Sequence, residues 1–325
     1  MKAGATWLAT HLYHFRLELV GETQVVKTLA RVLEGTPGAL VLLPTATEYL
    51  CESIVRGSGM LRAASHDQLT VVLSWHTFTY KEPDATAEQF SSQLRRWSDR
   101  ARPMQLQHTS ALESNAARWS SAAMSVPWLP WPLDAYETGE DQGVVSAPGE
   151  PRIYLYATRP EHGSQHILSL VGGIRREFSG GCQIRLWTGT RVAAELNANE
   201  HARRALDGVE ILSKGGDLAP FQASMRGSDI AVLPYDVAPY IGRGSGALIN
   251  LMVARIPVVV PAGTGLGDFV LHEGVGRTYR DRSEIPTLLR EMLQEEGRYD
   301  EAITRYLQKH QAAARLLVEI GGAAR

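Results

Sequence analysis

Cysteine is scarce in this chain, which has only Cys51 and Cys182 among its 325 residues. The two lie far apart, and neither belongs to a Cys-x-x-Cys or Cys/His pair. This pattern argues against a disulfide framework and a zinc site, and it is typical of a reducing compartment. The ten histidines include no His-x-His or His-Glu-x-x-His spacing. We therefore expect no metal centre.

Long apolar runs are also missing, since none approaches the roughly 20 residues of a membrane-spanning helix. The first residues, "MKAGATWLATHLYHFRLEL", lack the continuous apolar core and the small-residue cleavage site of a signal peptide. A cytoplasmic protein without a transmembrane segment is the expectation.

Charge of one sign is not in excess. The 33 basic and 35 acidic side chains leave a net charge of −2, so the chain as a whole lacks the basic excess that non-specific nucleic-acid binding needs. The hydrophobic fraction of 44% and charged fraction of 21% are typical of a soluble globular protein. A length of 325 residues fits two domains of ordinary size better than one large domain.

What the sequence does contain is an alternation of short apolar runs with amphipathic segments. This pattern indicates an α/β fold with largely parallel strands. The strands expected in the first half are residues 6–14, 38–44, 69–75, 104–109 and 125–130. The helices expected there are residues 23–33, 48–55, 85–100 and 110–119.

Residues 134–151, "DAYETGEDQGVVSAPGEP", interrupt the alternation with acidic, glycine and proline residues, as a linker does. We expect an N-terminal domain over residues 1–135, a linker over 136–151 and a C-terminal domain over 152–325, whose last helix can pack back on the first domain. The strands expected in the second half are residues 152–158, 182–189, 209–213, 229–235 and 256–262. The helices expected there are residues 164–178, 191–206, 218–225, 246–254, 284–296 and 300–320.

The segment "GRGSGALINLM", residues 242–252, has the chemistry of a phosphate-binding turn. Gly244 and Gly246 allow close backbone approach, Ser245 can donate its hydroxyl, and Arg243 can add a charge-assisted bond. The helix that follows would direct free N–H groups and its positive end at an anion. A tight turn leading into a packed helix explains the same residues equally well. The segment is neither a Walker loop nor a GxGxxG fingerprint.

Residues 232–270, "VLPYDVAPYIGRGSGALINLMVARIPVVVPAGTGLGDFV", resemble the C-terminal domain of GT-B glycosyltransferases, particularly the retaining family 4. The shared pattern is a strand ending in Pro, a glycine/serine loop, a helix, Pro-Val-Val and a second glycine loop. The resemblance extends, more weakly, to "YATRPEHGSQHIL", "VVLSWHTF" and "LQHTSALESNAARW…VPWLPWPLD". It implies the GT-B architecture, in which two Rossmann-like doubly wound parallel-sheet domains face a central cleft.

The resemblance also implies roles for individual residues toward the diphosphate and sugar of a nucleotide-sugar donor. The implied donor-binding residues are Arg159, His162, Arg243, Gly244, Ser245, Gly246, Asn250, Thr264 and Gly265. Arg159 directly follows a strand and is the expected diphosphate clamp, unless it is an ordinary surface arginine. His162 stands at the position of a family lysine. Asp268, in the second glycine loop, is expected to cap a helix.

Two further groups are placed by the resemblance in the first half. His76, just after the strand "TVVLSW", would face the cleft and either hydrogen-bond the donor sugar or support the reacting centre. A bond to a neighbouring loop is the alternative role. Glu18, Glu22 and Thr23 lie where this fold receives the acceptor. Glu22 and Thr23 fit a helix start slightly better. Trp128 and Trp131 fit a packed domain interface better than a stacked sugar or base.

The chain departs from the family at two acidic positions. The family's glutamates, eight positions apart, would fall at Gly242 and Asn250, and the glycine that ends the helix is replaced by Arg255. Asn250 can still hydrogen-bond a ribose hydroxyl, less strongly than a carboxylate does.

The expected function is a metal-independent, retaining transfer of a sugar from a nucleotide-sugar donor to a hydroxyl acceptor. Arg159 would stabilise the leaving diphosphate, and no cofactor beyond the donor is needed. The alternative is a catalytically silent GT-B-like protein that acts as a partner or scaffold of an active glycosyltransferase. An epimerase would need additional acids in the cleft. A phosphorylase would need a pyridoxal lysine, and Lys214 is the single lysine between Lys81 and Lys309.

Overall fold

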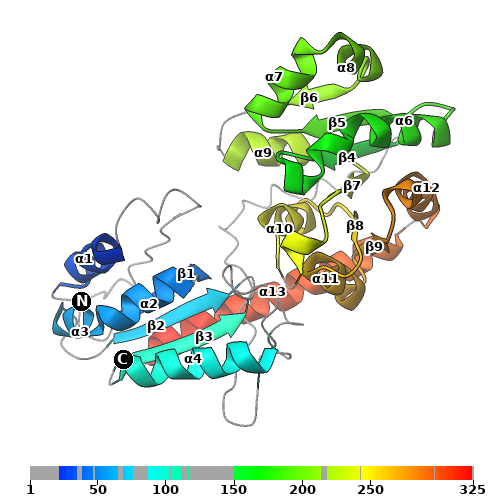
Figure 1. The fold of residues 1–325 in the computed structure, drawn as a ribbon. Helices are drawn as coiled ribbons and strands as arrows, with labels where there is room; N and C mark the ends of the chain where they lie inside the picture. The colour runs from blue at the N-terminus through cyan, green and yellow to red at the C-terminus, as the bar shows by residue number, and fades with distance from the viewer. Residues whose placement is uncertain are drawn as a thin grey trace. The chain divides into compact units, whose positions relative to one another are not determined.

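The computed structural model describes residues 22–34, 39–46, 48–64, 69–75, 87–102, 104–110, 116, 120, 150–213, 218–241, 243–295 and 297–323. The chain divides into two units (Figure 1). The first comprises Met1–Pro132 and His310–Arg325, and the second comprises Leu133–Lys309. Of the predicted linker, residues 136–151, only the last two residues lie in the described part.

The first unit contains a parallel sheet in the order β1-β2-β3. Its strands are β1 (Ala39–Ala46), β2 (Leu69–Trp75) and β3 (Gln105–Ser110). Its helices are α1 (Glu22–Leu33), α2 (Glu48–Arg56), α3 (Ser58–Ala64) and α4 (Ala87–Ala101). The strands predicted near 38–44, 69–75 and 104–109 and the helices predicted over 23–33, 48–55 and 85–100 are confirmed. The short α3 was not predicted, and the strands expected at 6–14 and 125–130 lie outside the described residues.

The core of the first unit follows from the period-two pattern of β2. Leu69, Val71 and Leu73 alternate along the strand and lie in one buried cluster with apolar residues of all four helices. Trp97 of α4 packs in this cluster and donates its indole N–H to Glu52 of α2 at 2.9 Å. This bond satisfies the polar edge of a large buried ring, so α2 and α4 are held together.

The second unit contains a parallel sheet in the order β6-β5-β4-β7-β8-β9. Its strands are β4 (Arg152–Tyr156), β5 (Gln183–Trp187), β6 (Glu210–Leu212), β7 (Ile230–Val232), β8 (Val258–Pro261) and β9 (Gly276–Tyr279). Its α-helices are α6 (Ile167–Glu177), α7 (Thr190–Ala198), α8 (Glu200–Ala205), α9 (Leu218–Met225), α10 (Gly246–Val253), α11 (Gly265–Glu273) and α12 (Ile285–Gln294). Its 3-10 turns are η1 (Pro160–His162), η2 (Ser164–His166), η3 (Ala238–Tyr240) and η4 (Arg282–Glu284).

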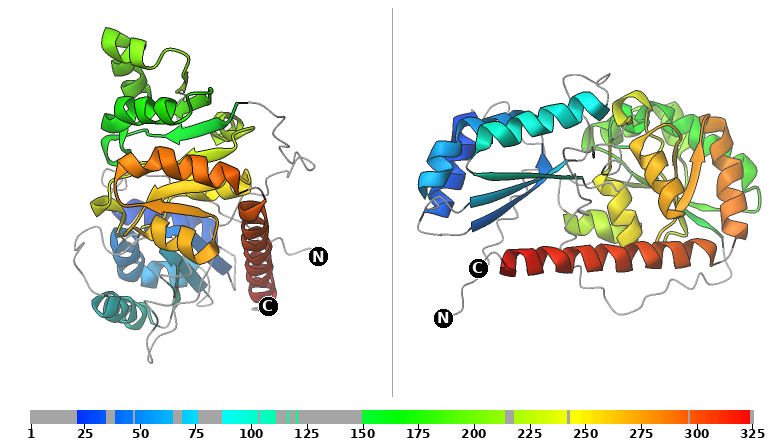
Figure 2. Two further views of the ribbon diagram at one scale, coloured as in Figure 1. Left: turned by 90° about the vertical axis from the view of Figure 1, so that its right-hand side faces the viewer. Right: turned by 90° about the horizontal axis from the view of Figure 1, so that it is seen from below.

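Helices cover both faces of this six-stranded sheet (Figure 1, Figure 2). α6 contacts α8 and α12 on one face, and right-handed crossovers place α9, α10 and α11 on the other. The strands β7 and β8 are buried along their whole length. This burial explains why they read as continuous apolar runs rather than alternating ones. The last helix, α13 (Arg298–Ala323), belongs to the second unit up to Lys309 and to the first from His310.

The strands β4 to β8 and the helices α6, α9, α10, α12 and α13 confirm the predicted alternation. The helix predicted over 191–206 is two helices, because Asn199 caps the second by accepting from the Ala202 amide at 3.1 Å. β9 was not predicted, since its sequence "GRTY" carries no apolar run. Its glycine is required by close packing: a Cβ at Gly276 would lie 2.0 Å from the Val258 carbonyl oxygen.

α10 ends in a Schellman turn whose left-handed position is filled by arginine. The Ile256 amide donates to Leu251 O at 2.9 Å and the Arg255 amide to Met252 O at 3.0 Å. Arg255 has φ of 58°, a conformation that favours glycine. Its side chain donates to the Thr304 hydroxyl at 2.8 Å.

Arg255→Gly is expected to stabilise the protein by about 1 kcal/mol, because it relieves the left-handed strain on a side-chain-bearing residue. Arg255→Ala keeps the strain and loses the bond to Thr304, so it should be slightly less stable than the wild type. Denaturant unfolding of the three proteins measures both differences. An Arg255→Gly variant no more stable than Arg255→Ala would contradict the strain argument.

Candidate functional site

The order of the strands reverses between β4 and β7. From β4 the chain moves outward through β5 and β6, then returns to place β7 on the other side of β4. Ligands of doubly wound sheets bind outside the carboxyl ends of the strands at such a switch point. The two loops that flank it here are residues 157–166 after β4 and 233–245 after β7.

These two loops are in direct backbone contact. The Asp236 amide donates to the Glu161 carbonyl at 3.0 Å. Gly163 has φ of 77°, and a Cβ there would lie 2.1 Å from the Pro234 carbonyl oxygen. A glycine is therefore required for the loops to approach this closely.

His162 is the side chain that links the two loops. It is buried, with 3% of its surface exposed. Its Nδ1 lies 2.6 Å from the Thr158 hydroxyl, and its Nε2 lies 2.7 Å from the Tyr240 hydroxyl. Its ring stacks on Tyr235 with centroids 4.4 Å apart and planes 16° from parallel. The imidazole is thus bonded at both nitrogens and packed on one face.

Burial, together with the nearby positive charges of Arg159 and Arg243, lowers the pKa of His162 to about 3. The side chain is therefore neutral near pH 7. The sequence resemblance placed His162 at the position of a cationic lysine, but here it contributes hydrogen bonds and packing rather than charge.

The stability of the second unit is expected to fall as the pH falls from 6.5 toward 3. The unfolded chain binds a proton at His162 below its ordinary pKa of 6.5, whereas the folded chain does so only near 3. Unfolding therefore takes up a proton in this window, with a slope of at most about 1.4 kcal/mol per pH unit. Denaturant unfolding of wild type and His162→Gln at pH 7, 5.5 and 4.5 measures it. Equal slopes in both proteins would contradict the assignment.

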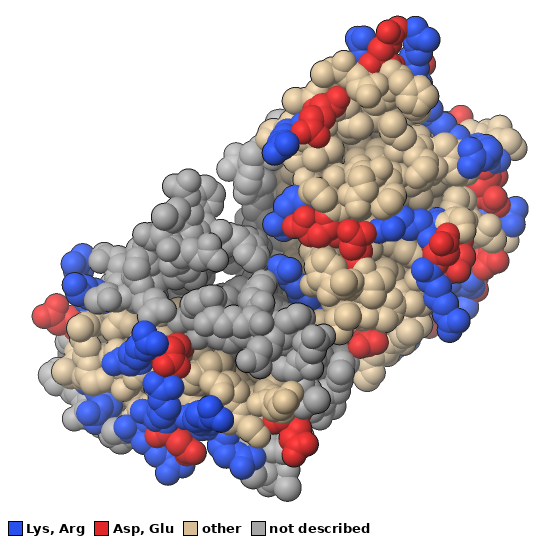
Figure 3. Space-filling model, in the orientation of Figure 1, with Lys and Arg blue, Asp and Glu red and all other residues tan. Residues whose placement is uncertain are grey.

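Two arginines lie near this imidazole, one in each loop. Arg159 is 52% exposed and pairs with Glu161 at 3.3 Å. The guanidinium of Arg243 lies 5.1 Å from the ring centroid of Tyr240. On the face of the second unit visible in Figure 3, basic side chains alternate with acidic ones rather than forming a broad basic area. The positive charge that acts on the imidazole comes from Arg159 and Arg243.

The start of α10 adds backbone donors to this group. Ser245 is the N-cap in an extended conformation, and its side chain makes no capping bond to the helix. The hydroxyl instead lies 3.1 Å from the Tyr235 hydroxyl. The N–H groups of the first turn of α10, which begins at Gly246, therefore donate no hydrogen bond to the Ser245 side chain. A helix N-terminus that binds an anion needs such available N–H groups. The structure thus brings Arg159, His162, Ser245 and Gly246 to one switch point.

Other predicted donor residues are engaged differently. The Asn250 side-chain amide donates to the Gly246 carbonyl at 2.7 Å, within its own helix. Thr264 is buried; its hydroxyl donates to the Pro261 carbonyl at 2.7 Å and accepts from the Gly267 amide at 3.0 Å. Thr264 is thereby the N-cap of α11, which begins at the buried Gly265. The prediction that Asp268 caps this helix is wrong, because Asp268 lies inside its first turn.

Several predicted residues fall where the structure gives no side chain. Glu18, His76, Trp128, Trp131 and Gly242 lie outside the described residues. Glu22 and Thr23 are the first residues of α1, which agrees with the helix-start interpretation, and their side chains are not described.

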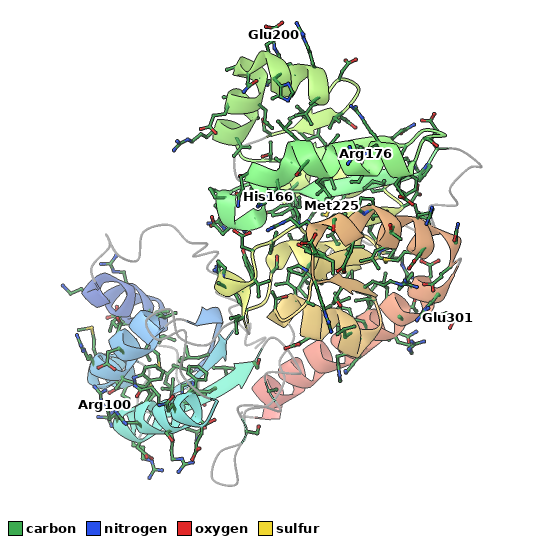
Figure 4. All side chains as sticks on the ribbon, turned by 45° about the vertical axis from the view of Figure 1, so that its right-hand side comes forward. Arg100, His166, Arg176, Glu200, Met225 and Glu301 are labelled. Atoms are coloured by element: carbon green, nitrogen blue, oxygen red, sulfur yellow. The ribbon has the colours of Figure 1, made fainter. Side chains whose placement is uncertain are left out.

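A hollow of about 260 Å³ beside the switch point was missed by the sequence reasoning. It lies at the carboxyl ends of β7 and β9, next to an ion pair between Asp236 and Arg282. His166, at the start of α6 in Figure 4, contributes to its wall. Its other lining residues are Ser169, Tyr235, Val237, Tyr279, Arg280 and Asp281. The sequence did not predict β9 as a strand. A strand ending at Tyr279 would have placed Arg280–Arg282 at the carboxyl edge of the sheet, where the hollow lies.

In the part of the chain that the structure describes, no three His, Cys, Asp or Glu side chains are grouped so that they could hold a metal ion. None of the helices in the same part combines the length and apolarity needed to cross a membrane.

No protein-family model matches the chain, and no curated protein sequence matches it. Solved structures do. The glycosylation-associated Gap123 complex from Streptococcus agalactiae matches with a TM-score of 0.60 and 12% identity, over 92% of this chain and 57% of that chain. Anabaena HepE in complex with UDP-glucose matches with a TM-score of 0.54 and 14% identity, over 92% and 82%. The pneumococcal O-GlcNAc transferase GtfA, in complex with UDP and GlcNAc, matches with a TM-score of 0.59 and 9% identity, over 94% and 60%.

At these identities the similarity shows the fold, which is the two-domain Rossmann-like GT-B architecture that the sequence predicted. The chain spans less than two thirds of the length of the Gap123 and GtfA chains. The particular membership in the retaining family 4 stays a prediction.

Proposed function

We propose that this chain is a glycosyltransferase that binds a nucleotide sugar at the switch point of its second unit and transfers the sugar to a hydroxyl acceptor. The observation that carries the proposal is the position of Arg159 and Arg243. They come from two different loops, both lie near one imidazole, and the uncapped start of α10 lies in the same loop region. Two guanidiniums and a helix N-terminus suit a diphosphate.

In the proposed reaction, negative charge grows on the departing diphosphate as its bond to the sugar breaks. Arg159, Arg243 and the amides at the start of α10 would stabilise that charge through preorganised hydrogen bonds. Because arginines and amides supply the neutralisation, the proposed reaction is metal-independent. Retention of the anomeric configuration and the absence of a dedicated general base follow from the resemblance to family 4.

Calorimetry with UDP, GDP, ADP and dTDP tests the donor site, followed by incubation of the matching sugar nucleotides with the protein. We expect one diphosphate to bind and its sugar nucleotide to be turned over, by slow hydrolysis when no acceptor is present. If folded protein binds none of the four, the proposal is wrong.

The second candidate is a catalytically silent GT-B protein that assists an active glycosyltransferase. The hydrogen bond from the Asn250 side-chain amide to Gly246 O favours this candidate. Asn250 stands where the family has a glutamate that would bond the donor ribose, but here the side chain bonds the backbone of its own helix. The similarity to a chain of the Gap123 complex supports the same reading. Diphosphate binding without any turnover of the matching sugar nucleotide would favour this candidate.

A further inference from the structure

The two nitrogens of His162 have defined roles in the hydrogen-bond chain. Nε2 lies 3.5 Å from Nη2 of Arg159 and 2.7 Å from the Tyr240 hydroxyl. Because a guanidinium can only donate, the contact with Arg159 favours the tautomer in which Nε2 is unprotonated. The Tyr240 hydroxyl then donates to Nε2, and the proton on Nδ1 is donated to the Thr158 hydroxyl at 2.6 Å. We infer the Nδ1–H tautomer of His162 from these contacts.

Through Tyr240, this imidazole reaches the second arginine. The Tyr240 hydroxyl bonds His162, its ring lies under the Arg243 guanidinium, and its carbonyl accepts the Arg243 amide at 3.1 Å. Tyr240 itself is 3% exposed, so it is held by its surroundings. The position of Arg243 therefore depends on a tyrosine that His162 anchors.

A second arm runs from the same imidazole to the start of α10. The face of His162 stacks on Tyr235, whose hydroxyl lies 3.1 Å from the Ser245 hydroxyl. His162 thus contacts Arg159 directly. Tyr240 connects it to Arg243, and Tyr235 connects it to Ser245.

We propose that His162 is the positioning residue of the anion site, which holds Arg243 and the start of α10 opposite Arg159 through Tyr240 and Tyr235. This inference rests on the proposed donor site and adds a role that a lysine at this position could not perform. A lysine would add charge, but its ammonium cannot accept the tyrosine and arginine bonds. His162 acts through these neighbours and does not touch the ligand.

Variants of the full chain separate positioning from general support of the fold. His162→Phe keeps a ring to stack on Tyr235 but removes both hydrogen bonds. His162→Gln places an acceptor where Nε2 lies and serves as the rescue variant. Tyr240→Phe removes the hydroxyl and leaves the ring under Arg243. His201→Gln, at an exposed histidine of α8, is the matched control.

The affinities of the variants for UDP and for uridine are the readout. We expect His162→Phe to lose about tenfold in UDP affinity, a loss of the size of one displaced charge-assisted bond. Tyr240→Phe should change in the same direction, while His162→Gln and His201→Gln should bind UDP nearly as the wild type does. Uridine affinity should be unchanged throughout, because uridine has no phosphate to meet the arginines. Nitrogen NMR should show the Nδ1–H tautomer of His162.

Three results would overturn the proposal. The first is a His162→Phe variant that binds UDP as tightly as the wild type, and the second is an equal loss of UDP and uridine affinity in that variant. The third is a proton on Nε2 of His162. If the wild type itself binds no diphosphate, the proposed donor site is wrong and the positioning role falls with it. If the wild type binds and His162→Phe binds equally well, only the positioning role is wrong.

Discussion

Replacing Arg159 and Arg243 together with alanine is expected to weaken nucleoside diphosphate binding by about a hundredfold or more. A hydrogen bond to a charged partner contributes about 1.5–3 kcal/mol, so the loss of two such bonds accounts for an effect of this size. The double variant should exceed either single variant, because each arginine comes from a different loop and can contact the diphosphate separately. Titration calorimetry on the four proteins measures these differences.

The fold is expected to survive both replacements. Arg159 is half-exposed, and its pair with Glu161 is a surface ion pair that contributes little to stability. Arg191→Ala is the matched control, since Arg191 is an exposed arginine of α7 whose ion pair with Glu195 is also on the surface. An unchanged affinity in the double variant would show that the diphosphate binds elsewhere, even if the protein is a glycosyltransferase.

Gly163→Ala is expected to lower the free energy of unfolding of the second unit by about 3 kcal/mol. The alanine would have to adopt the left-handed conformation at φ 77°, and its Cβ would meet the Pro234 carbonyl at 2.1 Å. That carbonyl belongs to the backbone of the other loop, so relief requires the loops to separate. Separation would stretch the hydrogen bond from His162 to Tyr240 and disturb its stacking on Tyr235, and diphosphate affinity should fall as well.

Gly180→Ala is the control for this prediction. Gly180 lies in the same unit, and an added Cβ there has no atom within 4 Å. Denaturant unfolding should show this variant to be close to the wild type. A Gly163→Ala variant as stable as Gly180→Ala would mean that the two loops can part without cost, and the close approach would not be needed for the site.

Much of the fold could be predicted from the sequence because its signals are local. The runs at 69–75 and 256–262 read as strands from their apolar pattern alone, and β2 and β8 lie within them. α3 and β9 were missed because seven residues and four residues carry too little pattern to be recognised. β9 is a strand because it pairs with its neighbour β8. Gly276 of β9 lies so close to Val258 of β8 that only a residue without a Cβ fits there.

Some features of the candidate site can likewise be predicted from local sequence, whereas others need the tertiary structure. The sequence by itself determined that Arg159, Arg243, Ser245 and Gly246 stand at strand ends and at a helix start, since these are properties of neighbouring residues. Only the tertiary structure decided what His162 is. Its partner Tyr240 lies 78 positions away, and the burial that keeps the imidazole neutral exists only once the loops after β4 and β7 have met. The charge of an imidazole depends on surroundings that no short stretch of sequence contains, so His162, expected at the position of a family lysine, is a neutral buried side chain.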